Sequence, residues 1–214
     1  MKTTLTRFNR LTLYKRMTLT QSGFSLIEVL ISIIILSFGL LGMVGLQASA
    51  IQSNREARLQ STASGLAREL AEMMRSNMLV ALGTTVSTNP FLADITSSGT
   101  PPAMVHGNPS YCLNTSNTAT ACANNTEVAR AQMTEWLARA NTDLPGAKVV
   151  VCVDSAPFDA SGVPQWGCTP GTNATFVVKL GWTRGSTDRS KTGVDALERA
   201  VVPSIVYPVT PGNS

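Results

Sequence analysis

The sequence is poor in charge and histidine, and proline is missing from its first part. Only 14% of the 214 residues are Asp, Glu, Lys or Arg, His106 is the sole histidine, and no proline precedes Pro90. A Ser-His-Asp or Cys-His catalytic site would need His106, which falls in a Pro- and Gly-rich stretch where we expect a solvated loop side chain. Phosphate-binding loops of the G-x-x-x-x-G-K-[ST] type are absent, and the acids are scattered. We therefore predict a protein that is not an enzyme and needs no cofactor or metal.

The net charge of +4 comes from the first residues of the chain. Five cations and no acid precede position 24, and the remainder is close to −1: Lys2, Arg7, Arg10, Lys15 and Arg16. Lys and Arg stay on the inner side of a membrane span, so this basic flank indicates a cytoplasmic N-terminus. A nucleic-acid surface would need cations clustered on the folded domain, and we predict no direct binding of nucleic acid.

The four cysteines lie beyond the apolar part of the chain and lack C-x-x-C spacing: Cys112, Cys122, Cys152 and Cys168. Zinc sites use closely spaced Cys and His ligands, so two disulfides are favoured over a metal site. Four cysteines allow three connectivities. The sequential pairing, 112–122 and 152–168, closes the shortest loops and is the one we favour. Disulfides imply an oxidising compartment, the periplasm or the cell surface.

Residues 24–46 form the longest apolar run and contain one acid, Glu28. As a helix, this run would be roughly 35 Å long, enough to cross the hydrocarbon core of a bilayer. A secretory signal cut after Ala48-Ser49-Ala50 and a plain signal anchor are alternatives. Neither explains a carboxylate within the membrane, which costs about 2–3 kcal/mol or more and marks a functional residue. The natural partner of Glu28 is a new amino group at Phe24, created by cleavage after Gly23.

The segment Gly23-Phe24-Ser25-Leu26-Ile27-Glu28-Val29-Leu30-Ile31 resembles the N-terminal motif of type IV pilins and type II secretion pseudopilins. The resemblance implies that a prepilin peptidase cleaves after Gly23 and that Phe24 becomes the N-methylated terminus. It also implies that Glu28 pairs with the terminal amine of a neighbouring subunit during assembly.

The resemblance and the pattern of the chain together divide it into four parts. Residues 1–23 would be the leader, although Met17 is an alternative start. Residues 24–50 would be the transmembrane and filament-core half of a helix, and residues 51–80 its amphipathic half. Residues 81–214 would form a periplasmic or surface globular region.

The expected helix, from about Phe24 to about Leu79, has two sequence features of its own. Gly39, Gly42 and Gly45 would allow close helix packing or local melting during assembly, and these interpretations are compatible. An apolar stripe should face a sheet: Leu59, Ala63, Leu66, Leu70, Met73 and Asn77. Arg68 and Glu72 should pair on the outer side.

The C-terminal part predicts a helix over Asn124–Ala140, with Asn124 and Glu127 as a capping box and Trp136 in the core. Strands are predicted over Ala147–Val153, Phe176–Thr183 and Val201–Val209, the last at a sheet edge because of its prolines. The stretch before the helix, residues 83–125, should be loop with room for a short strand. The fold class is therefore α+β, pilin-like: a long N-terminal helix packed on a small antiparallel sheet.

The long helix, the Trp136…Leu144-Pro145-Gly146 stretch and the FVVKLGWT strand resemble minor pilins of the type IV pilus modification family, PilV. This resemblance implies a minor pilin that joins or primes a type IV pilus. Its partners would be the prepilin peptidase, other major and minor pilins, the inner-membrane assembly platform and membrane lipid. It would sit in the bacterial inner membrane before assembly and on the cell surface afterwards. The alternatives are a minor pseudopilin of a type II secretion system and a membrane-anchored periplasmic binding domain.

Overall fold

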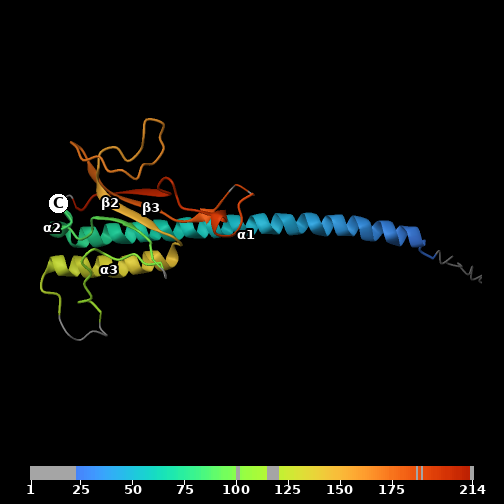
Figure 1. The fold of residues 1–214 in the computed structure, drawn as a ribbon, viewed down its shortest axis with the longest axis horizontal. Coiled ribbons are helices and arrows are strands. Elements are labelled where there is room, and N and C mark those ends of the chain that lie inside the picture. Colours follow the sequence, from blue (N-terminus) through green and yellow to red (C-terminus); the bar gives the residue numbers. More distant parts are fainter. Residues whose placement is uncertain (1–22, 100–101, 115–120, 187, 189, 213–214) are drawn as a thin grey trace, which may run out of the picture. The chain divides into compact units, whose positions relative to one another are not determined.

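The computed structural model describes residues 23–99, 102–114, 121–186, 188 and 190–212 (Figure 1). The chain forms two compact units, residues 1–49 and residues 50–214. The expected leader, except Gly23, and the alternative start Met17 lie outside the described residues. The α+β fold class is confirmed, because a long N-terminal helix is combined with a small antiparallel sheet.

Helix α1 covers Leu26–Ser76, and a short helix, α2, covers Met78–Ala81. The single helix predicted to reach about Leu79 is therefore interrupted at Asn77, whose φ of −125° and ψ of 54° are not helical. We also expected Asn77 to belong to the apolar stripe that faces the sheet, but its side chain makes a polar contact instead. Its side-chain amide donates a 2.8 Å hydrogen bond to the backbone oxygen of Asn125, which ties the end of α1 to the start of another helix.

The core of the second unit contains the inner face of α1. The buried residues of this face follow steps of three and one: Ala63, Leu66, Ala67, Leu70, Ala71 and Met74. Leu59 and Met73 lie at its margin and are only partly buried. Glu72 pairs with Arg75, so the predicted ion pair between Arg68 and Glu72 was wrong.

Helix α3 covers Asn125–Asp143 and runs alongside the second half of α1 (Figure 1). Trp136 is fully buried, as predicted, and its indole nitrogen donates a 3.0 Å hydrogen bond to the backbone oxygen of Leu66. The helix ends at Asp143, Leu144 is its C-cap, and Gly146 follows with a φ of +59°. A Cβ on Gly146 would lie 2.1 Å from the hydroxyl of Thr183, so glycine is needed at this turn.

The main sheet has the order β1-β2-β3-β6, and every neighbouring pair is antiparallel. Its strands are β1 Ala93–Thr96, β2 Lys148–Asp154, β3 Thr175–Gly181 and β6 Ile205–Val209. β6 is an edge strand, as its prolines predicted. It starts later than expected, because pairing with β3 begins only where the Ser204 amide donates to the oxygen of Leu180, after Pro203.

A second, two-stranded sheet was not predicted from the sequence. It pairs β4, Arg184–Gly185, with β5, Leu197–Glu198, and a short 3-10 helix, η1, covers Gly193–Ala196. These strands have two residues each and no hydrophobic alternation, so no periodic signal could reveal them.

The outer face of the main sheet is covered by the loop between β2 and β3. Trp166 of this loop lies over Gly181, where a Cβ would come within 2.8 Å of the indole ring. Beneath the loop, Lys179 and Asp154 are buried, at 0% and 1% exposure, and form an ion pair of 2.6 Å. The loop therefore adds a small second core that contains two charges.

Candidate functional site

The predicted cleavage position lies directly before the first turn of α1. Gly23, Phe24 and Ser25 precede the helix, which begins at Leu26. The backbone oxygen of Ser25 accepts hydrogen bonds from the amides of Glu28, at 3.0 Å, and Val29, at 3.3 Å. Cleavage after Gly23 would thus leave Phe24 and Ser25 ahead of an already formed helical turn.

Phe24 and Glu28 lie together at this helix start. Both line one shallow groove on the helix, with Val29, Ser32, Ile33 and Leu36. Glu28 is in the first turn, where the partial positive charge of the helix N-terminus favours an anion. Among the residues that the structure describes, no cation forms an ion pair with Glu28. The groove therefore presents an acid with room for an external or terminal amine.

The apolar run that follows Glu28 is uncovered within the chain. Its large side chains are exposed throughout, from 46% for Ile34 to 84% for Leu26. By length and composition, α1 could cross a membrane, and its most apolar window has a mean hydropathy of 2.6. Soluble proteins rarely expose apolar surface on this scale, and such a surface is typical of a contact with membrane or with another protein.

The three glycines of this run have no close neighbours inside the chain. At Gly39, Gly42 and Gly45, nothing lies within 4 Å of the position that a Cβ would take. No contact of the described residues therefore requires glycine there. Their predicted roles, close packing against other chains or local melting, stay predictions.

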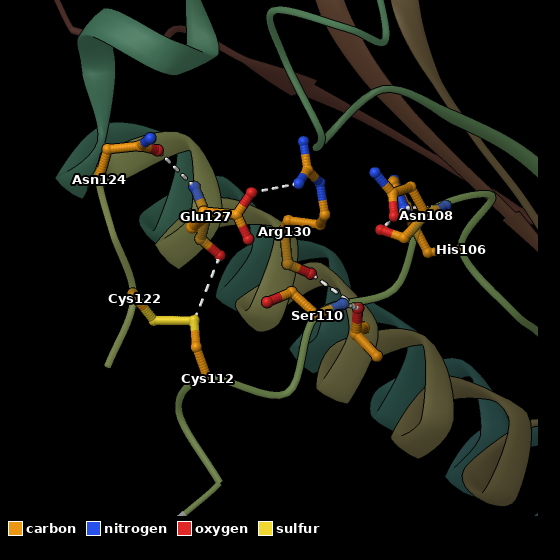
Figure 2. Close-up of polar contacts among 9 residues, drawn as sticks. His106, Asn108, Ser110, Cys112, Cys122, Asn124, Glu127 and Arg130 are labelled. Carbon is orange, nitrogen blue, oxygen red and sulfur yellow. Dashed lines mark hydrogen bonds and ion pairs between the residues drawn. A yellow bond between two sulfur atoms is a disulfide. The ribbon is translucent and has the colours of Figure 1, made fainter. Parts of the chain in front are cut away.

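The second unit contains two disulfides, Cys112–Cys122 and Cys152–Cys168, in the sequential pairing that we favoured. The first lies beside the start of α3, where the Cys112 sulfur is 3.7 Å from the backbone oxygen of Glu127 (Figure 2). The second joins β2 to the loop over the sheet. Cys152, Asp154 and Cys168 bring three potential metal ligands within 4.8 Å, but both sulfurs are bonded and Asp154 is paired with Lys179.

His106 is not the solvated side chain that we expected. It is only 5% exposed, and its ring bonds the backbone at both nitrogens. Nε2 lies 3.1 Å from the oxygen of Pro90, and Nδ1 accepts a 3.2 Å hydrogen bond from the Asn108 amide (Figure 2). The prediction was wrong because loop composition does not show which loops pack on each other. His106 thus connects the segment at Pro90 to its own loop.

Comparison with known proteins gives one match, and it falls on this N-terminal segment. Residues 19–44 match the prokaryotic N-terminal methylation motif. No curated protein matches the chain. No solved structure matches it either. The match includes Gly23, Phe24 and Glu28 but not the C-terminal stretches on which the resemblance to type IV pilus modification proteins rests. The N-terminal segment of this chain is therefore of the type IV prepilin-like kind.

Proposed function

We propose that this chain is a minor pilin, a structural subunit that joins or primes a type IV pilus. The observation that carries the proposal is Glu28, an acid without a cation partner among the described residues, at the start of an uncovered apolar helix within the methylation motif. In this proposal, prepilin peptidase cleaves after Gly23 and Phe24 becomes the methylated terminus.

The mechanism is a transfer of the apolar helix between two apolar surroundings. Before assembly, the helix crosses the inner membrane with the second unit on the periplasmic side. During assembly, it leaves the lipid and packs among the helices of other pilins, so little apolar surface meets water. Glu28 would pair with the terminal amine of a neighbouring subunit, which lowers the cost of burying both charges and fixes the axial register.

Two other functions remain as alternatives. A minor pseudopilin of a type II secretion system would use the same cleavage and the same helix, and the match to the motif favours neither machine. A membrane-anchored periplasmic binding domain would not need cleavage after Gly23. The resemblance of the C-terminal stretches to type IV pilus modification proteins supports the pilus over the secretion machine.

Replacing Glu28 with alanine tests the assembly role. The Glu28→Ala chain should be cleaved and inserted into the membrane as usual, because neither step needs the carboxylate to pair with another subunit. Its amount in sheared pili should fall by roughly tenfold or more, since the buried partner amine loses its counter-charge. Quantitative immunoblots and immunogold labelling of sheared pili measure this amount.

The matched control is Glu72→Ala, which removes an acid from the exposed side of the same helix. Among the described residues, the one ion pair of Glu72 is with Arg75 at the surface, so this variant should enter pili at the normal level. Equal incorporation of Glu28→Ala and Glu72→Ala would refute the assembly role. Absence of the unaltered chain from pili, combined with a secretion defect on its deletion, would favour the pseudopilin.

A further inference from the structure

A groove in the second unit lies between the first turns of α1 in that unit and the end of α3. It has a volume of about 490 Å³, and six of its lining residues matter here: Ile51, Asn54, Arg55, Arg58, Leu59 and Asp143. Arg55 and Arg58 are exposed, and Asp143 is exposed at the last turn of α3. The groove thus has two cations on one wall and an acid on the other.

Within the part of the chain that the structure describes, the two arginines have no acidic partner, although acids lie near them in the sequence. Glu56, between them in the sequence, pairs with Arg184, and Glu69 pairs with Arg139. Across the described ranges of the chain, neither Arg55 nor Arg58 forms an ion pair. Two guanidinium groups one helical turn apart can together hold one phosphate through charge-assisted hydrogen bonds.

The position of Arg55 in the sequence indicates where such a phosphate would come from. No Asp, Glu, Lys or Arg lies between Glu28 and Arg55. This stretch corresponds to roughly 40 Å of helix at about 1.5 Å per residue. A bilayer measures about 40–45 Å with its headgroups.

The opposite wall of the groove carries negative charge, so it favours a positively charged group on the ligand. Asp143 stands at the C-terminal end of α3, where the last backbone oxygens carry partial negative charge. A simple anion would be repelled there, whereas a primary ammonium group would be attracted. A headgroup with a phosphate and an ammonium therefore matches the charges better than a phosphate alone.

We propose that this groove binds the headgroup of a zwitterionic phospholipid with a primary amine, of the phosphoethanolamine class. Arg55 and Arg58 hold the phosphodiester, and Asp143 with the end of α3 holds the ammonium. The groove would seat the second unit at the membrane surface while the chain resides in the membrane. The inference rests on the membrane span and not on the type of filament.

Lipid retention by the full chain tests this site. The chain is purified in a mild detergent and titrated with phosphatidylethanolamine, phosphatidylglycerol or inorganic phosphate, and bound lipid is counted by native mass spectrometry. The unaltered chain should retain phosphatidylethanolamine best.

Three variants test the residues of the groove. The double variant R55A/R58A should lower this retention by roughly fivefold or more. R68A, which removes an exposed arginine further along α1, should retain lipid like the unaltered chain. D143N should abolish the preference for phosphatidylethanolamine over phosphatidylglycerol.

Several outcomes would overturn the proposal. Equal retention by the unaltered chain and R55A/R58A would show that the detergent-embedded helix alone holds the lipid. Displacement of lipid by equimolar inorganic phosphate would indicate a free-phosphate site. Loss of a chain–chain complex in R55A/R58A, with lipid retention unchanged, would make the groove a protein interface. The circular dichroism spectrum of each variant should match that of the unaltered chain, which shows that the variant folds. Entry into pili is measured separately, so the lipid proposal can fail while the pilin proposal holds, and the reverse.

Discussion

At the scale of single residues, Lys179 and Asp154 form a buried ion pair in the second unit, where each charge depends on its partners to offset the loss of water. Asp154 accepts hydrogen bonds from Lys179 and from the amides of Ala156 and Thr169, while Lys179 also donates to the oxygen of Gly167. Burial by itself would raise the pKa of the Asp154 carboxyl, but these hydrogen bonds outweigh burial and lower its pKa. The stability that this shift contributes is therefore present above the unfolded pKa of about 3.9 and is lost as the pH falls through the folded value.

Removing one partner of this pair should destabilise the protein strongly. Lys179→Met leaves Asp154 buried without its counter-charge, which should lower the free energy of unfolding by about 3–5 kcal/mol. Urea unfolding of the full chain in detergent, followed by tryptophan fluorescence, measures the change.

Two further variants separate the loss of the buried pair from the loss of a lysine. Lys191→Met removes a surface lysine that pairs with Glu198, and its unfolding midpoint should match that of the unaltered chain. The double variant Asp154→Asn/Lys179→Met should recover part of the lost stability, because no buried charge is left. A Lys179→Met chain as stable as Lys191→Met would contradict our account of the pair.

At the scale of elements, the start of α3 is fixed by its N-cap. Asn124 has an extended backbone, and its side-chain oxygen accepts a 2.9 Å hydrogen bond from the Glu127 amide (Figure 2). The predicted capping box is only half formed, because the Glu127 carboxylate pairs with Arg130. The Glu127 amide, which has no hydrogen-bond acceptor within the helix, is thus satisfied by the Asn124 side chain alone.

Replacing the cap should therefore have a measurable cost. Asn124→Ala should lower the free energy of unfolding by about 1 kcal/mol. The adjacent Asn125→Ala removes the same type of side chain from the first helical position, where it is exposed, and should cost little. Urea unfolding of the two variants gives the comparison. Equal losses would mean that the Asn124 side chain does not stabilise the helix.

At the scale of the whole molecule, the decisive feature is a long apolar helix that the chain itself does not cover. In the proposed processing, the mature protein begins at Phe24 and keeps this helix. Mass spectrometry of the N-terminal peptide of the membrane-bound form should show a chain that begins at Phe24 and carries one added methyl group. A chain that still carries residues before Phe24, or one trimmed after Ala50, would contradict the proposed processing.

The sequence by itself determined the features that depend on neighbouring residues. The absence of proline before Pro90 and the run from Phe24 to Leu46 predicted α1 to within a few residues of its observed end. Loop lengths pointed to the disulfide pairing, and Asn124 predicted the start of α3. These features are local, since helix periodicity, caps and short loops are set by residues close in the chain.

Only the tertiary structure decided which polar groups are buried and which strands meet. His106 is buried because a loop folds over Pro90, and Lys179 meets Asp154 because β3 pairs with β2 in one register. The groove at Arg55 exists only because α3 ends beside α1. Contacts between residues far apart in the chain depend on register and packing, and a single sequence carries no local signal for them.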